Sequence, residues 1–151
     1  MTLRLLAVCL GNICRSPMAE GSLRQRAEAM GLAVEVDSAG LGAWHVGEPP
    51  NATGLAVAAA RGYDNGGQRA RQIRASDFDD FDLIFAMDAS NLAALERQRP
   101  SGARARLALF DPDGRDVPDP YGEPRPVYEA TLNQIEAAAA AWVETLSREA
   151  R

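Results

Sequence analysis

Short apolar runs alternate with helix-like segments along this chain, and that alternation constrains its fold more than any other feature. Four runs have the aliphatic composition of buried strands, at Leu3–Cys9, Val34–Val36, Leu83–Met87 and Ala105–Phe110. Strands that alternate with helices form βαβ units, in which the strands are parallel and helices cover both faces of the sheet. The sequence therefore predicts an α/β fold, in which ligands bind outside the carboxyl ends of the strands.

The segments between these runs carry the signals of helices and loops. One helix is expected to begin at Ser16-Pro17, with Ser16 as its cap, and to stop at Gly31. Further helices are predicted at 52–61 and 88–99, with a short capped turn at 76–79. Glycine and proline predict two long loops, at 38–51 and 111–126. The last helix places apolar residues on one packing face, namely Tyr128, Leu132, Ile135, Ala139, Trp142 and Leu146.

The composition limits the class of protein. The 151 residues are enough for one domain with its own core, and we expect a single domain over residues 1–151. A formal net charge of -5 and the lack of a basic run argue against a nucleic-acid-binding surface. The apolar stretches are too short to span a bilayer, and Met1–Arg4 leads into a strand without the layout of a signal peptide. Two cysteines are too few for a disulfide scaffold, so a cytoplasmic enzyme is expected.

One turn carries both cysteines and an arginine, in the stretch VCLGNICRSP (Val8–Pro17). A structural pair, a redox pair and a nucleophile with a neighbouring thiol all fit its C-x5-R pattern. Between a strand and a helix start, backbone N–H groups lack helical partners, and a curled loop turns them into an anion cup. Gly11 and Asn12 permit the curl, and the Arg15 guanidinium matches two oxygens of a phosphate group.

Cys9 stands where such a cup would activate a thiol. Loop N–H groups, a helix N-terminus and Arg15 favour the thiolate, which is a good nucleophile towards phosphorus. Ser16 can add a hydrogen bond to the sulfur, and the same donors would stabilise the transferring group. No Gly-Lys-Ser/Thr follows, so this is not the loop that binds nucleoside triphosphates.

A leaving group that departs as an oxyanion also needs a proton donor. His45 is the one histidine of the chain, beside Trp44 in a glycine-rich loop, and a lone histidine is more often on the surface than catalytic. Prolines on both sides of Asp119, in VPDPY (Val117–Tyr121), favour an extended backbone there. From this spacing alone a polar turn is the simpler interpretation, and a general acid is the alternative.

Five stretches together resemble the low-molecular-weight protein tyrosine phosphatases along the whole chain. They are VCLGNICRSPMAEG (Val8–Gly21), DSAGLGAWHVGEPP (Asp37–Pro50), RARQI (Arg69–Ile73), DFDLIFAMDASNL (Asp80–Leu92) and VPDPYG (Val117–Gly122). The resemblance implies a flavodoxin-like three-layer sandwich with a four-stranded parallel sheet. It also implies hydrolysis of phosphotyrosine and aryl phosphate monoesters through a phosphocysteine, with neither metal nor cofactor.

The resemblance further implies roles for individual residues. Cys9 matches the nucleophile, Arg15 the phosphate-binding arginine, and Asp119 the general acid that later acts as a base. Trp44 and Tyr121 match aromatic walls that enclose a phenyl ring. The phosphate loop and its support are matched by Leu10, Gly11, Asn12, Ile13, Cys14 and Ser16. The implied partners are a tyrosine-phosphorylated protein substrate, for which a bacterial tyrosine kinase is one candidate, and phosphate as product and inhibitor. A monomer or a weak homodimer is expected.

One cysteine and three departures from the family pattern leave questions open. In the family a second loop cysteine can pair reversibly with the nucleophile, so Cys14 is a redox candidate, and packing beneath the loop is the alternative. Gln68 stands where many members have histidine, so a network that uses that imidazole must be rebuilt or absent. Gly122 stands in place of a second tyrosine, and Glu123–Pro126 replaces a glycine-rich or acidic rim that bears on which phosphopeptides fit.

Three other functions fit parts of the pattern. Arsenate reduction uses the same loop and fold, but its thiol relay needs cysteines beyond Cys9 and Cys14. Protein-arginine phosphatases carry threonine where this chain has Ile13, whereas Trp44 and Tyr121 suit a flat aromatic ring. A phospho-binding module without turnover would need no acid. We therefore expect phosphotyrosine hydrolysis.

Overall fold

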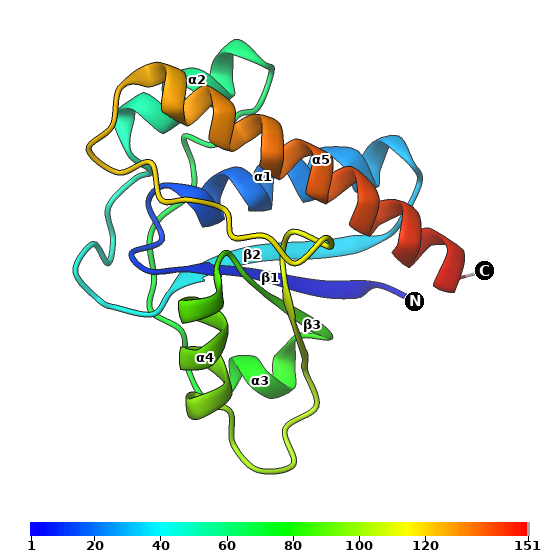
Figure 1. The fold of residues 1–151 in the computed structure, drawn as a ribbon. Coiled ribbons are helices and arrows are strands. Elements are labelled where there is room, and N and C mark those ends of the chain that lie inside the picture. Colours follow the sequence, from blue (N-terminus) through cyan, green and yellow to red (C-terminus); the bar gives the residue numbers. More distant parts are fainter. Residues whose placement is uncertain (151) are drawn as a thin grey trace.

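The four apolar runs form one parallel sheet in the computed structural model, which describes residues 1–150 (Figure 1). The strands are β1 (Leu3–Cys9), β2 (Val34–Gly40), β3 (Leu83–Ala86) and β4 (Arg106–Leu109), in the spatial order β2-β1-β3-β4. β1 is central and pairs in parallel with both β2 and β3. Residues 5–8 of β1 are aliphatic and fully buried, as a strand covered on both faces requires.

Helices cover both faces of this sheet (Figure 1). α1 (Arg15–Ala29), α2 (Ala52–Ala60) and α5 (Arg125–Glu149) lie on one face, and α3 (Asp77–Asp80) and α4 (Ala89–Gln98) lie on the other. The predicted α/β fold, a flavodoxin-like three-layer sandwich with a four-stranded parallel sheet, is confirmed. Across residues 1–150, no helix combines the length and the hydropathy that a membrane crossing requires.

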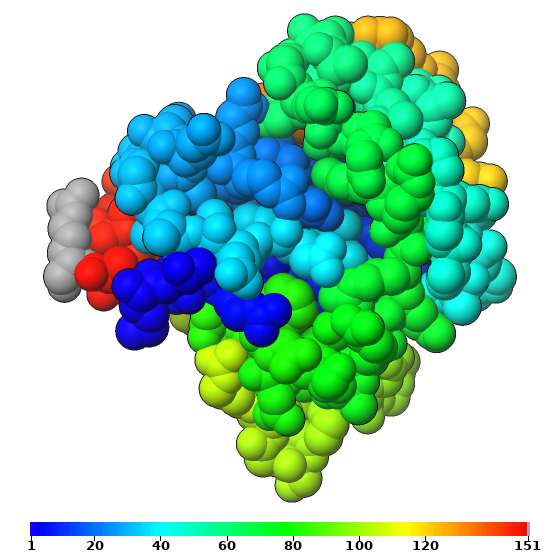
Figure 2. Space-filling model, turned by 180° about the vertical axis from the view of Figure 1, so that it is seen from behind, coloured from blue at the N-terminus to red at the C-terminus, as the bar shows by residue number. Residues whose placement is uncertain are grey.

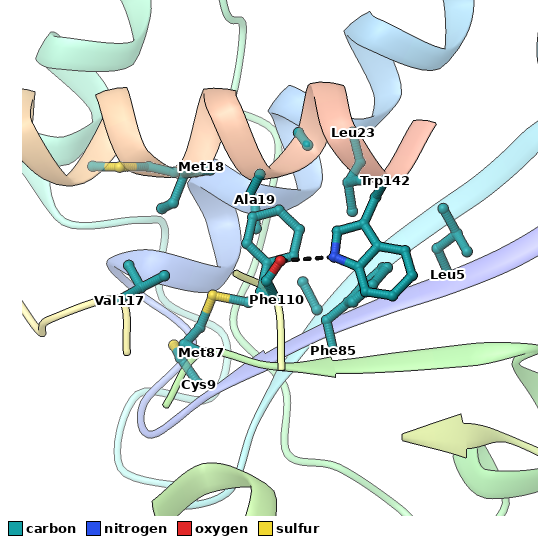
Figure 3. Packing of buried hydrophobic residues seen from close by; sticks show 14 of the residues in the cluster. Leu5, Cys9, Met18, Ala19, Leu23, Phe85, Met87, Phe110, Val117 and Trp142 are labelled. Carbon is teal, nitrogen blue, oxygen red and sulfur yellow. Dashed lines mark hydrogen bonds between the residues drawn. The ribbon is translucent and has the colours of Figure 1, made fainter. Parts of the chain in front are cut away.

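The larger core fills the space between the sheet and the layer of α1 and α5. Figure 3 shows side chains of this core, among them Leu5 and Phe85 from the strands and Leu23 and Trp142 from the helices. Trp142 packs edge-on against Phe85, with ring centroids 5.0 Å apart, and its indole N–H donates to the Phe110 carbonyl oxygen at 2.7 Å. The predicted apolar face of the last helix is confirmed, because all six of its residues are buried: Tyr128, Leu132, Ile135, Ala139, Trp142 and Leu146.

The carboxyl ends of the strands bring distant segments of the chain to one edge of the sheet. β1 ends at Cys9, which lies in register with Gly40 at the end of β2. β3 leads into the start of α4, and β4 leads into a long loop that ends at α5. Figure 3 shows Cys9, Met87 and Val117, one from each of three such segments, near one another in the core.

The second strand is longer than its sequence pattern predicts. Residues 38–40, predicted as loop, continue β2 as far as Gly40. On its outer side the Gly40 N–H donates to the Arg71 carbonyl, and the Ile73 N–H donates to the Gly40 carbonyl, each at 2.8 Å. Figure 2 shows residues 61–75, coloured green, beside the cyan residues at the end of β2. Because these partners lie more than thirty residues away, local composition does not reveal the strand.

Two helices begin earlier than their sequence signals indicate. α1 begins at Arg15, so the prediction that Ser16 caps it is wrong, and no described side chain caps this helix. The Ser16 hydroxyl instead lies 3.0 Å from Cys9 Sγ. α5 begins at Arg125, inside the predicted loop, because Pro126 fits the first turn of a helix, where a missing N–H costs nothing.

The Trp142–Phe110 hydrogen bond predicts how the two tryptophans differ in their effect on stability. In Trp142→Phe the buried Phe110 carbonyl loses its indole donor, so the free energy of unfolding should fall by about 1–3 kcal/mol. Trp44→Phe is the matched control, because Trp44 is 68% exposed and should change stability little. Urea denaturation of both variants measures the difference, and equal losses would contradict this view of the core.

Candidate active site

The loop between β1 and α1, residues 10–14, leaves its backbone N–H groups free of backbone acceptors in the described part of the chain. The carbonyl oxygens of residues 9, 10 and 13 accept hydrogen bonds from backbone N–H groups of surrounding segments, at 3.0, 3.0 and 2.8 Å. Within residues 1–150, no backbone acceptor binds the N–H groups of residues 10–14. Asn12 turns the chain with a φ of 58°, in the left-handed region that asparagine tolerates. Because the carbonyl groups are engaged outside the loop, the unpaired N–H groups form a cup suited to an anion.

Asn12 also fixes the direction of the hydrogen bonds beneath this cup. Its Oδ1 accepts from the Arg71 backbone N–H at 3.0 Å, so its amide nitrogen must face the other way. Asn12 Nδ2 donates to Ser16 Oγ at 2.8 Å, and Ser16 Oγ lies 3.0 Å from Cys9 Sγ. A thiolate can only accept a hydrogen bond, so once Cys9 has lost its proton the Ser16 hydroxyl donates to it and stabilises the negative charge on Sγ.

A buried carboxylate holds the far end of the same network. Asn12 Nδ2 also donates to Ser38 Oγ at 2.9 Å, and the Ser38 hydroxyl donates to Glu20 Oε1 at 2.7 Å. The Glu20 side chain is 8% exposed and is balanced by Arg24, whose Nη2 lies 2.6 Å from Glu20 Oε2. Gln68, which replaces the family histidine, bonds instead to the Pro17 carbonyl at 3.2 Å. The network is thus built without an imidazole.

Arg15 is buried and held in one orientation. Its Nη1 donates to Asp88 Oδ2 at 2.6 Å and to the Val117 carbonyl at 2.9 Å. Nε is buried and has no hydrogen-bond partner in the described part of the chain, so the edge of the guanidinium formed by Nε and Nη2 remains available to a ligand. Burial raises the pKa of Asp88, but hydrogen bonds from Arg15, the Asn91 N–H and Ser90 outweigh it, so the net pKa lies below its usual value. Asp88 therefore stays ionised and balances the Arg15 charge.

Asp119 approaches this arginine from the loop before α5. Its Oδ2 lies 3.7 Å from Arg15 Nη2, and its Oδ1 accepts from the Tyr121 backbone N–H at 3.1 Å. The side chain is 42% exposed, so the carboxyl group remains open to a bound molecule. It can exchange protons with a ligand that occupies the cup.

A cavity of about 170 Å³ joins these groups. Trp44 and Tyr121 stand at its mouth, 68% and 59% exposed, and Ile13 adds an apolar side chain that is nearly buried. The buried polar groups Cys9 and Arg15 thus line the inner part of the cavity, and exposed aromatic side chains line its outer part. The lining comprises Cys9, Leu10, Gly11, Ile13, Cys14, Arg15, Trp44, His45, Asp119 and Tyr121.

The structure places the predicted site residues in two groups. Most of them line the cavity, including Cys9, Arg15 and Asp119. Asn12 and Ser16 do not line it: they are buried beneath it and bond to one another. Three segments far apart in sequence therefore meet at one edge of the sheet, as the topology predicts.

Sequence reasoning missed three residues of this site. His45, which the sequence favours as a surface residue, lines the cavity, and its Nδ1 lies 2.6 Å from Glu48 Oε2. Asp88 accepts a hydrogen bond from Arg15, and Glu20 accepts one from the Ser38 hydroxyl. Asp88 had a detectable signal, because it directly follows a buried strand at the carboxyl edge of the sheet. Glu20 had none, because it lies within a helix.

Cys14 has a different environment from Cys9. Its side chain is buried, and its Sγ shares a hydrogen bond with Tyr128 Oη at 3.7 Å. Burial raises the pKa of Cys14 to about 12, despite the opposing hydrogen bond from Tyr128. Both cysteines are free thiols in the structure. At neutral pH Cys14 is therefore protonated and a weak nucleophile, which is the state expected of a packing residue.

The arrangement combines a thiol, an anion cup, a clamped arginine and an exposed carboxyl group. Among residues 1–150, no three histidine, cysteine or acidic side chains cluster closely enough to hold a metal ion. The cup and Arg15 can bind the oxygens of a phosphoryl group, Cys9 can attack its phosphorus atom, and Asp119 can transfer a proton.

Comparison with known proteins gives one family. The family model of the low molecular weight phosphotyrosine protein phosphatases matches residues 4–151. A low molecular weight protein-tyrosine-phosphatase of Streptomyces coelicolor is 46% identical over 149 residues, which cover 92% of this chain and 90% of that protein. The crystal structure of YfkJ from Bacillus subtilis has a TM-score of 0.91 at 35% identity, covering 100% of this chain and 98% of the other. Vibrio vulnificus Wzb in complex with benzylphosphonate has a TM-score of 0.86 at 30% identity, covering 95% and 98%.

The contrast between the two thiols predicts which one reacts with an alkylating agent. At pH 7 iodoacetate, an anion that the cup and Arg15 can bind, should modify Cys9 and should spare Cys14, whose pKa is about 12. Peptide mass spectrometry locates the label. Inorganic phosphate should slow the reaction, because it fills the cup.

Cys14→Ser is the matched control and should be alkylated at an unchanged rate. Labelling of Cys14 as fast as Cys9 at neutral pH would contradict the raised pKa of Cys14.

Proposed function

The chain belongs to the low molecular weight phosphotyrosine protein phosphatase family, and from this premise we propose that Cys9, Arg15 and Asp119 carry out the reaction. As a member it is a protein-tyrosine phosphatase, a hydrolase of phosphotyrosine. The observation that carries our assignment of residues is the single cavity in which the thiol, the arginine and the carboxyl group face one another.

In the first step Cys9 transfers the phosphoryl group to itself. The loop N–H groups and the free edge of Arg15 hold the three phosphoryl oxygens, and Cys9 Sγ attacks phosphorus as a thiolate. The S–P bond forms while the bond from phosphorus to the tyrosine oxygen breaks. Asp119 gives its proton to that oxygen, so the leaving group departs as a neutral phenol.

In the second step water releases the phosphate. The Asp119 carboxylate takes a proton from water, and the water oxygen forms a bond to phosphorus. The electrons of the S–P bond return to Cys9 Sγ, where the Ser16 hydroxyl donates a hydrogen bond to the thiolate. Inorganic phosphate then leaves the cup, and Asp119 is again protonated for the next cycle.

The mouth of the cavity supports an aromatic substrate. Trp44 and Tyr121 offer flat faces on which a phenyl ring can pack, and Ile13 offers no polar group to a guanidinium. The homologue Vibrio vulnificus Wzb binds benzylphosphonate, which joins a phosphonate to an aromatic ring. We therefore propose phosphotyrosine in a protein as the physiological substrate class, with inorganic phosphate as product and inhibitor. Arsenate reduction is less well supported, because the chain has just two cysteines.

A panel of substrates tests the substrate class. The protein should release phosphate from a phosphotyrosine peptide and from p-nitrophenyl phosphate, and at least about a hundredfold more slowly from phosphoserine and phosphoarginine, which lack the ring. Cys9→Ser should abolish turnover, because a hydroxyl replaces the thiolate, while inorganic phosphate still binds. Comparable rates on phosphoarginine, or substantial turnover by Cys9→Ser, would refute the proposal.

The role of Asp119 predicts a dependence on the leaving group. In Asp119→Ala, kcat/KM should fall by about 10²–10⁴ for phenyl phosphate, which needs the acid, and much less for p-nitrophenyl phosphate, whose leaving group is more stable as an anion. Steady-state kinetics on both substrates measure the ratio. An equal loss on the two would indicate a structural role for Asp119.

A further inference from the structure

The loop between β4 and α5, residues 110–124, carries Asp119 and is fixed at several points before it reaches that residue. We call it the acid loop. Gln134 of α5 donates from Nε2 to Asp111 Oδ2 and to the Asp116 carbonyl, each at 2.9 Å. The Val117 N–H donates to the Met87 carbonyl at 2.8 Å. Asp119 follows two positions after Val117, and the single residue between them, Pro118, restricts the backbone there.

One side chain of this loop reaches the opposite helix layer. Asp116 Oδ1 accepts from the backbone N–H of Ala89, the first residue of α4, at 2.9 Å. The first N–H groups of a helix have no partner within the helix, and a carboxylate is favoured there by the helix dipole. The neighbouring Asp88 is the cap of the same helix and accepts from the Asn91 N–H at 2.8 Å. Two consecutive residues at the start of α4 therefore hold different parts of the site: Asp88 holds Arg15, and Ala89 holds the acid loop.

These contacts close into a ring. Arg15 Nη1 donates to Asp88 Oδ2, Asp88 is linked to Ala89, and the Ala89 N–H donates to Asp116. Asp116 is linked to Val117, whose carbonyl accepts from the same Arg15 nitrogen at 2.9 Å. Three hydrogen bonds and two peptide linkages thus join the phosphate-binding arginine to the acid loop.

We propose that Asp116 is a positioning residue for the general acid. It fixes the acid loop to the N-terminus of α4, beside the residue that holds Arg15, and so sets where the Asp119 carboxyl group lies relative to the bound phosphoryl group. Asp116 is not among the residues that line the cavity. The inference rests on the proposed role of Asp119 as the acid.

The kinetic consequence of losing this contact differs from that of a general loss of stability. In Asp116→Ala, kcat/KM for phenyl phosphate should fall about fivefold, the effect of losing one capping hydrogen bond, whereas kcat/KM for p-nitrophenyl phosphate should change little. The inhibition constant of inorganic phosphate should be unchanged, because Asp88 still holds Arg15. In the Asp119→Ala background, Asp116→Ala should have no further effect on either substrate, since there is no acid left to place.

Two variants serve as matched controls. Asp116→Asn keeps an oxygen acceptor for the Ala89 N–H and should retain activity within about twofold of the parent protein on both substrates. Asp113→Ala removes an acidic residue of the same loop that is 78% exposed and contacts Arg115 at 3.6 Å, so it should have no effect on the ratio of the two rates.

Each possible outcome either supports or overturns the positioning role of Asp116. Selective loss on phenyl phosphate, rescue by Asp116→Asn and no added effect in Asp119→Ala support the inference. An equal loss on both substrates, weaker inhibition by phosphate, or an additive loss in the Asp119→Ala background overturns it. Asp119→Ala alone, measured on the same two substrates, separates the failures. If it shows no dependence on the leaving group, the acid role of Asp119 fails and the inference about Asp116 fails with it. If it shows that dependence and Asp116→Ala does not, the positioning role alone fails.

Discussion

The hydrogen bonds of Asn12 are the constraint on which the rest of the site depends. From its left-handed conformation this residue turns the 10–14 loop, and its side chain bonds to the Arg71 backbone, Ser16 and Ser38. The Asn12 amide also holds Ser16 Oγ 3.0 Å from Cys9 Sγ, where the hydroxyl can donate to a thiolate. The same turn leaves the loop N–H groups unpaired around the cavity. One residue thus shapes the anion cup and directs a donor to the nucleophile.

The charges of the site are balanced in two pairs, one between two elements of the fold and one within a single helix. Arg15 on α1 pairs with Asp88 at the start of α4, and Glu20 on α1 pairs with Arg24 one turn later. Buried charges are costly unless they are paired, so these contacts make a buried arginine and a buried carboxylate tolerable. They also leave Arg15 Nε without a hydrogen-bond partner in the described part of the chain, and the edge that it forms with Nη2, 3.7 Å from Asp119, is the one that a phosphoryl group can occupy. Asp88 therefore neutralises the Arg15 charge on one side of the guanidinium, and the other side can bind a phosphoryl group.

Much of this could be predicted from the sequence, and the exceptions share a physical cause. The buried strands, the parallel sheet and the turn that holds Cys9 and Arg15 follow from local periodicity and from glycine and proline signals. The extension of β2 to Gly40 and the contributions of Glu20 and Asp88 do not. Each of these depends on a partner distant in sequence, such as Arg71 for Gly40 or Arg15 for Asp88. Asp119 could be predicted only in part. Its flanking prolines can be recognised in the sequence, but its approach to Arg15 arises only from the order of the strands.

The central claim is that the phosphoryl group passes through a covalent bond to Cys9. The most direct test is rapid quenching during turnover of an aryl phosphate, followed by peptide mass spectrometry with fragmentation between Cys9 and Cys14. The account predicts a phosphoryl group on Cys9 that appears in a burst stoichiometric with the enzyme and decays at the rate of turnover. A phosphoryl group on Cys14 or on another residue, or turnover without any phosphorylated intermediate under conditions that preserve phosphocysteine, would contradict it.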